Sequence, residues 1–262
     1  MARAAVPTAR EIALYSDAIL DTAGTPDYPN AINGLQLENQ GNVGGIAAAV
    51  DFSRRAIEGA IVEGANLLVV HHGMFWAGLD RLSGPAYSRL RLLLDNDIAV
   101  YSSHLPLDRH PTLGNNALLA KELSLKPERP FARHGDFSIG VAGDCDLETM
   151  SLHQRANAFA QKEGGTARIS YVKKGRRTAK WAICTGAGAS ADTISEAVAD
   201  GIDTMIVGEG PHWTAVSAEE HGIAIIYAGH YATETLGVRA LASHLAERFA
   251  LPWTFVNAPT GL

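Results

Sequence analysis

The fold and the chemistry of this chain are best worked out from one stretch, Leu67-Leu68-Val69-Val70-His71-His72-Gly73. A short apolar run bounded by glycines predicts a strand that is buried on both faces, as in a parallel sheet. The two histidines then lie at the carboxyl end of that strand, the edge where open α/β sheets bind ligands. Consecutive strand residues point to opposite faces, yet both imidazoles can converge on one cavity where the strand gives way to a loop.

The composition sets the class of protein. The chain has 262 residues, of which 47% are hydrophobic, enough for one large or two medium cores, and we expect two packed units. Against 28 acidic residues there are 22 Lys and Arg, a net charge of −6 that leaves no electrostatic footprint for nucleic acid. The basic patch at residues 173–177 is short and typical of a solvated hairpin tip, with an anion site as the alternative.

Cysteine usage and hydropathy indicate the compartment. Cys145 and Cys184 lie far apart without CxxC spacing, which excludes a disulfide framework and a thiolate zinc site. Residues 1–15 carry charges and lack the apolar core of a signal peptide, and no later run has the length of a membrane span. We therefore expect a soluble, cytoplasmic protein with no membrane partner.

Strands and helices alternate along the first half of the chain. Thr8 and Glu11 form a capping box before an amphipathic helix, and Ser53 caps a second helix after a strand at residues 45–51. A helix over residues 87–94 and a strand over residues 98–101 follow. This alternation predicts βαβ units with right-handed crossovers and a mostly parallel sheet.

Two polar stretches are expected outside the regular elements. Residues 33–36, Asn-Gly-Leu-Gln, are predicted to lie on a loop because turn residues surround them. Pro106 excludes a strand or helix interior, so His104 and Asp108 are expected on a shaped loop after the strand.

The second half of the chain repeats the first. A strand at residues 180–185, a helix at 191–199 and a strand at 204–207 lead to Gly208-Glu209, and a strand at 223–228 leads to His230. An acid stands four residues after a histidine in both halves, as Asp108 and as Glu234. Two copies of one α/β unit, residues 1–127 and 128–262, account for this pattern, with their strand ends facing a shared cleft. The segments 137–142, 147–159 and 169–172 between them read as strand, helix and strand and carry no chemistry.

The ligand types at these strand ends indicate a metal site. A single histidine after a strand is more often a structural residue, but a His-His pair combined with two His-x3-acid signals favours divalent metal. The donors suffice for two ions about 3.5–4 Å apart with one bridging carboxylate. His110 and His212 are close enough in sequence to line the same cavity, whereas the remaining histidines are expected at the surface.

At these residues the sequence resembles the Nif-three-like family of dinuclear metal proteins, also called GTP cyclohydrolase I type 2 homologues. The motifs that carry the resemblance, in chain order, are Asn33-Gly34-Leu35-Gln36, Val69-Val70-His71-His72, His104-Leu105-Pro106-Leu107-Asp108, Gly208-Glu209 and Gly229-His230-Tyr231-Ala232-Thr233-Glu234. The resemblance implies two similar, intertwined α/β/α units with mixed, mostly parallel sheets, a central inter-domain cleft and a ring-shaped homohexamer.

The resemblance also implies a set of site residues. Glu234 would be the bridging ligand, His104 a histidine that lines the site, and Glu209 a further site residue whose preceding turn departs from the common family pattern. The implied metal ligands are His71, His72, Asp108, His230 and Glu234. Two divalent ions would bind there, and ligand softness does not separate zinc, iron, manganese and nickel.

Three functional hypotheses follow. The first is a di-metal-dependent hydrolase, GTP cyclohydrolase-like by resemblance, in which an activated water attacks a nucleotide or related small molecule and His104 and Glu209 assist. The second hypothesis is a metal-dependent phosphoesterase, which needs the same ligands. The third hypothesis is a metal-binding or regulatory scaffold without turnover.

Overall fold

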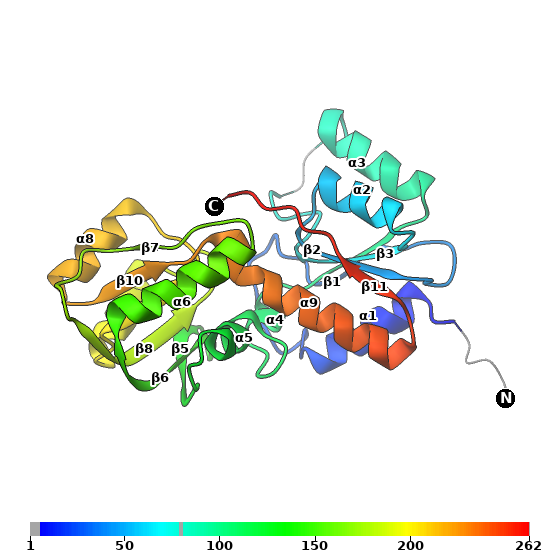
Figure 1. The fold of residues 1–262 in the computed structure, drawn as a ribbon. Coiled ribbons are helices and arrows are strands. Elements are labelled where there is room, and N and C mark those ends of the chain that lie inside the picture. Colours follow the sequence, from blue (N-terminus) through cyan, green and yellow to red (C-terminus); the bar gives the residue numbers. More distant parts are fainter. Residues whose placement is uncertain (1–5, 79–80, 262) are drawn as a thin grey trace. The chain divides into compact units, whose positions relative to one another are not determined.

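The computed structural model describes residues 6–78 and 81–261, and these form two compact units. Unit 1 contains the described residues up to Leu107 together with Val238–Ala258. Unit 2 contains Asp108–Gly237 together with the described residues from Pro259 onward. Each unit is a layered α/β structure with helices on both faces of its own sheet (Figure 1).

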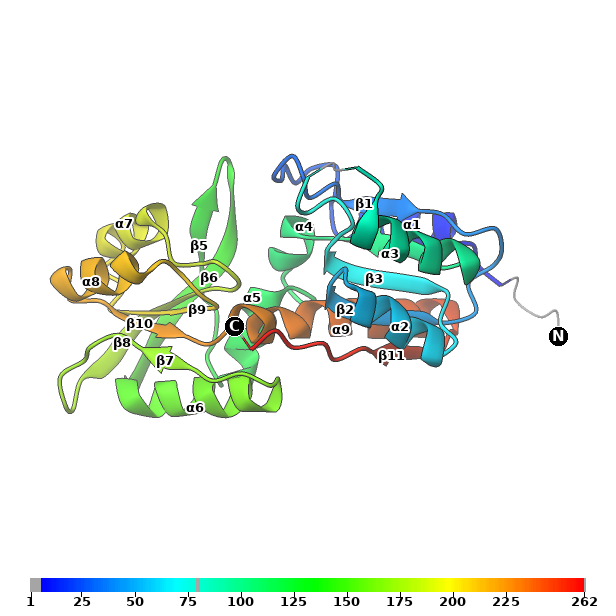
Figure 2. The same ribbon diagram turned by 90° about the horizontal axis from the view of Figure 1, so that it is seen from above.

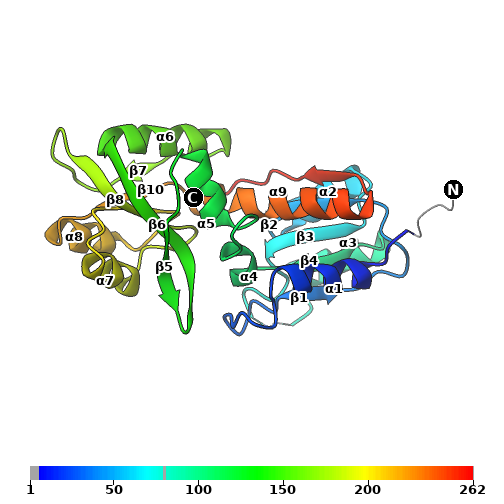
Figure 3. The ribbon, with the colours of Figure 1, turned by 90° about the horizontal axis from the view of Figure 1, so that it is seen from below.

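Unit 1 is built on a five-stranded sheet with the order β1-β4-β3-β2-β11. Its strands are β1 (Gly34–Leu37), β2 (Ile46–Asp51), β3 (Leu67–His72), β4 (Ala99–Ser102) and β11 (Trp253–Phe255). Strands β2, β3 and β4 are parallel, β11 pairs parallel with β2, and β1 runs antiparallel to β4. Helices α2 (Arg54–Val62) and α3 (Gly84–Asp95) cover one face, and α1 (Ala9–Ile19) and the later part of α9 (His230–Phe249) cover the other (Figures 1 and 3).

Local sequence signals explain these elements. Thr8 and Glu11 form the predicted capping box of α1, and the Ser53 side chain accepts a hydrogen bond from Ala56 N at the start of α2. Every residue of β3 is buried, which confirms the prediction of a strand covered on both faces. The strand continues through His71 and His72, so both histidines have strand geometry.

Unit 2 is built on a six-stranded sheet with the order β5-β6-β8-β9-β10-β7. Its strands are β5 (Arg129–His134), β6 (Phe137–Glu148), β7 (Arg168–Ile169), β8 (Arg177–Cys184), β9 (Thr204–Val207) and β10 (Ala224–Tyr227). Strands β8, β9 and β10 are parallel, while β5, β6 and β7 pair antiparallel. Strand β8 alternates sides, since Trp181 and Ile183 join one core and Ala182 and Cys184 the other.

Helices cover both faces of the second sheet. Helices α7 (Ala191–Ala199) and α8 (His212–Glu220) pack on one face, and α6 (Thr149–Lys162) packs on the opposite face (Figure 2). Helix α5 (Asn115–Glu122) also packs there, through Leu119 and Ala120 (Figure 3).

The two units share one topology. In each, a helix and an antiparallel edge strand precede a β-α-β-α-β segment, and that edge strand pairs with the third parallel strand. The two units exchange the helices that come after their third parallel strands. Helix α5 comes after β4 of unit 1 but packs in unit 2, and α9 comes after β10 of unit 2 but lies mostly in unit 1. The fold is therefore a pair of similar, intertwined α/β/α units with mixed sheets.

The spatial boundary of the units differs from the sequence boundary at residue 127. Unit 1 ends at Leu107 and regains Val238–Ala258, and the chain passes from one unit to the other inside α4 (Leu105–Asp108) and inside α9. The physical reason is the pairing of β11 with β2, which returns the end of the chain to the first sheet.

Two local expectations are wrong. Residues 34–37 form β1 rather than a loop, because Gly34 and Leu35 pair with the free edge of β4. Leu105–Asp108 form the short helix α4 rather than an irregular loop, because Pro106 lies in a first turn, where its missing N–H costs no hydrogen bond.

Helix length and hydropathy bear on membrane association. Among residues 6–78 and 81–261, no helix is both long enough and apolar enough to cross a bilayer.

Candidate metal centre

Three histidines gather at the carboxyl edge of the sheet in unit 1. His71 and His72 are the last residues of β3, and His104 follows the adjacent parallel strand β4. The three residues are 0%, 6% and 7% exposed. Parallel strands end at the same edge, which is why residues more than thirty positions apart meet here.

The three imidazoles lie close to one another. The His71 ring centroid is 4.8 Å from that of His72 and 4.9 Å from that of His104. One ring nitrogen of each histidine lies within 4.8 Å of those of the other two, a spacing at which they could hold a metal ion. The predicted convergence of His71 and His72 is therefore present although the strand continues through both.

Hydrogen bonds set the tautomer of each histidine. His71 Nδ1 lies 2.9 Å from the carbonyl oxygen of Ser103. A carbonyl oxygen only accepts hydrogen bonds, so Nδ1 carries the proton and Nε2 keeps the lone pair. His72 Nδ1 lies 2.8 Å from Asp51 Oδ1, and His104 Nδ1 lies 2.9 Å from Asp27 Oδ1. All three histidines thus offer Nε2, supported by an oxygen behind the ring, an arrangement typical of metal-binding histidines.

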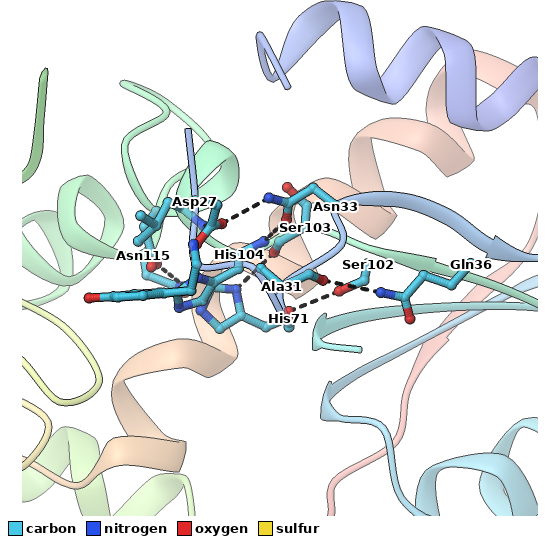
Figure 4. Close-up of polar contacts among 12 residues, drawn as sticks. Asp27, Ala31, Asn33, Gln36, His71, Ser102, Ser103, His104 and Asn115 are labelled. Carbon is cyan, nitrogen blue, oxygen red and sulfur yellow. Dashed lines mark hydrogen bonds and ion pairs between the residues drawn. The ribbon is translucent and has the colours of Figure 1, made fainter. Parts of the chain in front are cut away.

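Asp27 is held by a network of its own (Figure 4). Its Oδ2 accepts hydrogen bonds from Asn33 Nδ2 at 2.8 Å and from the Leu105 amide at 2.9 Å. Burial alone raises the pKa of this carboxyl, but the hydrogen bond and charge of His104, together with the hydrogen bonds from Asn33 and Leu105, outweigh burial and lower the pKa to about 2. Asn33 Oδ1 also accepts the His104 backbone N–H at 2.7 Å. Asp27 and Asn33 together fix the position of His104.

Gln36 supports the loop that follows His72. Its amide donates to the carbonyl of Ile32 at 2.8 Å, and its Oε1 accepts the Met74 amide at 2.6 Å. A Cβ on Gly73 would lie 2.4 Å from the Gln36 side chain, so glycine permits this close approach. Asn33 and Gln36, which carried one motif of the sequence, therefore act by shaping the surroundings of the histidines (Figure 4).

Unit 2 contains a second group of predicted site residues. Glu209 follows β9, while His230 begins α9 and Glu234 lies one turn later. His230 Nδ1 lies 2.9 Å from Glu209 Oε1, and His230 Nε2 lies 3.2 Å from Glu234 Oε2. Burial lowers the pKa of His230, but the hydrogen bonds and charges of Glu234 and then Glu209 outweigh it and raise the pKa to about 9. A metal bound by His230 would have to displace that proton.

The loop after β8 makes room for Glu234. A Cβ on Gly186 would lie 2.2 Å from Glu234 Oε1, and Gly186 has φ +61°. The Gly186 amide donates to Thr233 Oγ1 at 3.1 Å, while its carbonyl accepts the Glu209 amide at 2.8 Å. One glycine therefore contacts the segments that carry both Glu209 and Glu234.

Asp108 is tied to the same helix through Asn115. Asn115 Nδ2 donates to Asp108 Oδ1 at 2.8 Å, and Asn115 Oδ1 accepts the Gly237 amide of α9 at 2.7 Å. Asp108 is 7% exposed and Glu234 is 2% exposed. Unit 2 thus holds two buried carboxylates at α9: Glu234 lies on the helix, and Asp108 is linked to it through Asn115.

The donor chemistry of both groups fits divalent metal. Unit 1 supplies imidazole Nε2 atoms, and unit 2 supplies carboxylates with one imidazole, the ligand mixture of hydrolytic zinc, iron and manganese sites. A buried hydroxyl oxygen adjoins each group in sequence, Ser103 Oγ before His104 and Thr185 Oγ1 before Gly186. Neither oxygen has a hydrogen-bond partner among the described residues. Such atoms are expected where water or a ligand binds.

Sequence reasoning missed the residues behind the histidines. Asp51 ends β2, the parallel strand beside β3, so its position at the same sheet edge was a usable signal. Asp27 lies in an irregular stretch and gave no such signal. Asn115, the first residue of α5, was also missed. His110 Nδ1 accepts the Leu113 amide at 3.0 Å, a loop-stabilising contact.

Comparison with known sequences places the chain in a family. The sequence matches the family described as Duf34/NIF3 (NGG1p interacting factor 3) over residues 7–260. It is 40% identical over 236 residues to a Deinococcus radiodurans protein named GTP cyclohydrolase 1 type 2 homolog, a match that covers 90% of this chain and 88% of that one. A Halobacterium salinarum protein of the same name is 39% identical, with 95% and 96% covered. The chain belongs to the DUF34/NIF3 family, as its motifs predicted.

Solved structures have the same fold. A protein titled ybgI, of unknown function, superposes with a TM-score of 0.87 at 33% identity, covering 97% of this chain and 100% of that one. TTHA1606 from Thermus thermophilus gives 0.85 at 32% identity with the same coverage. Reduced HcgD from Methanocaldococcus jannaschii gives 0.80 at 23% identity, covers 96% and 98%, and supports the fold alone.

Proposed function

We propose that this protein is a di-metal-dependent hydrolase that acts on a nucleotide or a related small molecule. His71, His72, Asp108, His230 and Glu234 would bind two divalent ions. The observation that supports this most strongly is that His71 and His72 are buried at one sheet edge beside His104, each with Nδ1 held by an oxygen so that Nε2 is available as a ligand.

A bound pair of divalent ions would supply an acidified water and a Lewis acid for the substrate. In this proposal the chain's own residues move protons and hold the ligands. Asp27 keeps the proton of His104 on Nδ1, so His104 Nε2 can accept a proton from the attacking group. Glu209 orients His230 through Nδ1 and leaves Nε2 directed at Glu234.

The names of relatives bear on the substrate class. Relatives carry the name GTP cyclohydrolase 1 type 2 homolog, which favours a nucleotide. A phosphoesterase would use the same donors, so opening of a guanine ring and cleavage of a phosphate ester are separate arms of one substrate screen. We also propose a homohexamer, with a mass in solution six times that of the 27.8 kDa chain, and a cytoplasmic location, in keeping with two free cysteines.

Replacing Glu234 by Gln tests the metal assignment. The change preserves shape but removes the charge that the ions would share, so we expect the metal content of the purified protein to fall while the fold is retained. Elemental analysis measures the metal, and circular dichroism measures the fold. Glu219→Gln, at an exposed position of α8, is the matched control. An unchanged metal content in Glu234→Gln removes Glu234 from the ligand set.

Replacing His104 by Ala tests the catalytic assignment. We expect bound metal to be retained and the rate of nucleotide hydrolysis to fall by about 10²–10⁴-fold, the usual contribution of a proton-transfer group. His221→Ala, on an exposed histidine after α8, is the control. Loss of metal in His104→Ala would make His104 a ligand. Absence of turnover on every nucleotide and phosphate ester by metal-loaded protein would leave a metal-binding scaffold as the function.

A further inference from the structure

Two exposed aromatic side chains adjoin the histidines of unit 1. The Trp76 ring centroid lies 4.5 Å from those of both His72 and His104, tilted by 35° and 61°. Tyr28 lies on another loop, with its ring centroid 5.9 Å from that of His104. His104, on which the two aromatic rings converge, is itself only 7% exposed.

The exposure of these aromatic rings distinguishes them from core residues. Trp76 is 37% exposed and Tyr28 is 53% exposed, whereas Trp181 in the core of unit 2 is 0% exposed. Large aromatic rings gain most by burial, so a tryptophan that packs on two imidazoles and still leaves a third of its surface open has incomplete cover. Tyr28 and the Trp76 loop meet the same histidine from positions almost fifty residues apart.

We propose that Trp76, with Tyr28 beside it, forms a stacking surface for the planar heteroaromatic ring of the substrate, and that this surface selects ligands that carry a base. The inference rests on the proposed function for the place of the reaction, at the neighbouring histidines, and for a nucleotide as the substrate class. Aromatic side chains bind bases through their π-faces and tolerate different base identities. Trp76 is accordingly a specificity-determining residue, and its contribution lies in binding.

Two probe ligands isolate the contribution of the base to binding. Guanosine 5′-monophosphate and ribose 5-phosphate share the sugar and the phosphate and differ in the base. Isothermal titration of metal-stripped protein with each probe measures the base contribution without turnover. We expect guanosine 5′-monophosphate to bind at least about tenfold more tightly than ribose 5-phosphate, because one stacked base contributes about that much.

Substitutions of Trp76 test whether this residue causes the preference for guanosine 5′-monophosphate over ribose 5-phosphate. Trp76→Leu is expected to weaken guanosine 5′-monophosphate by about tenfold and to leave ribose 5-phosphate unchanged, while Trp76→Phe keeps most of the preference. Trp213→Leu, at a comparably exposed tryptophan of α8, is the matched control. Should Trp76→Leu fail to fold, Tyr28→Leu is measured instead, with a smaller loss expected in the same direction.

The outcomes separate this inference from the proposed hydrolysis. Equal affinity for the two probes, binding of neither, or an unchanged preference in Trp76→Leu overturns the stacking surface, whatever the hydrolytic screen shows. A Trp76-dependent preference without turnover keeps the surface and removes the hydrolase proposal. In metal-loaded enzyme that turns over, Trp76→Leu should raise KM with little change in kcat.

Discussion

Individual oxygen atoms behind the rings set the chemistry of the histidine group. Asp27, Asp51 and the Ser103 carbonyl each hold one Nδ1, so three imidazoles share one tautomer. The carboxylates of Asp51 and Asp27 lie behind the rings of His72 and His104 and fix the orientation of those rings. At the scale of residues, the site is therefore determined as much by what lies behind the histidines as by the histidines.

Replacing Asp27 by Asn should lower stability in a pH-dependent way. The folded pKa of about 2 lies below the ordinary value of 3.8, so the stabilisation from this carboxylate is complete above about pH 4 and is lost as the pH falls through about 2. We expect Asp27→Asn to lower the free energy of unfolding by about 1–3 kcal/mol at pH 7, the cost of weakened charge-assisted hydrogen bonds.

Urea denaturation between pH 7 and pH 2.5 measures this effect. The gap between the wild type and Asp27→Asn should narrow in the acid range. Asp136→Asn, at an exposed turn between β5 and β6, should show no comparable gap. A gap that stays constant down to pH 2.5 would contradict the role of the Asp27 charge.

At the scale of elements, strand ends and helix starts bring the donors together. Parallel strands deliver His71, His72 and His104 to one edge in unit 1. In unit 2 the loop between β8 and α7 contacts the first turn of α9 through Gly186. Such loops tolerate little change, because a carboxylate packs directly against their backbone.

Replacing Gly186 by Ala should displace Glu234. The new Cβ would lie 2.2 Å from Glu234 Oε1, in addition to the strain of a side chain at φ +61°. Gly175→Ala provides a matched control, because Gly175 has φ +76° and no atom within 4 Å of the added Cβ. Backbone strain alone costs about 1–2 kcal/mol in either variant.

Urea denaturation of the two glycine variants measures the cost of backbone strain, and elemental analysis measures whether Glu234 has been displaced. We expect both variants to lose stability, but only Gly186→Ala to lose bound metal, in the manner of Glu234→Gln. Equal metal content in Gly186→Ala and Gly175→Ala would mean that Glu234 keeps its position or does not bind metal.

At the scale of the whole molecule, the chain exchanges helices between its two units. Val238–Ala258 complete unit 1, where His244 hydrogen-bonds to Tyr15 of α1 at 2.8 Å and β11 extends the sheet beside β2. Arg239 also lies over the ring of Phe255, with 3.9 Å from its guanidinium carbon to the ring centroid. Unit 1 thus depends on residues from both ends of the chain.

A fragment of residues 1–127 should not fold on its own. It lacks β11 and the later part of α9, which leaves the edge of β2 unpaired and the sheet face beside α1 partly uncovered (Figure 1). We expect no cooperative urea transition for the fragment by circular dichroism, and recovery of a transition when a peptide of residues 238–258 is added. A cooperative transition in the fragment alone would show that the sequence repeat is also an independent folding unit.

Local sequence was sufficient for much of this protein. Capping residues placed the starts of α1 and α2, apolar runs placed β2, β3 and β4, and the repeat of His and acid at matching strand ends selected the candidate ligands. These features depend on neighbours within a few positions, such as the hydrogen bond from a cap to its own first turn.

Tertiary structure alone decided the rest. β1 is a strand because the edge of β4 pairs with it, and Asp27 contacts His104 across seventy-seven positions. Helix α5 of the first sequence repeat packs in unit 2, and most of α9 of the second repeat packs in unit 1. Such contacts join residues that are distant in the chain and carry no local periodicity. The sequence by itself therefore selected the candidate metal ligands, whereas the tertiary structure decided what orients them, because orientation comes from hydrogen bonds between segments that only folding brings together.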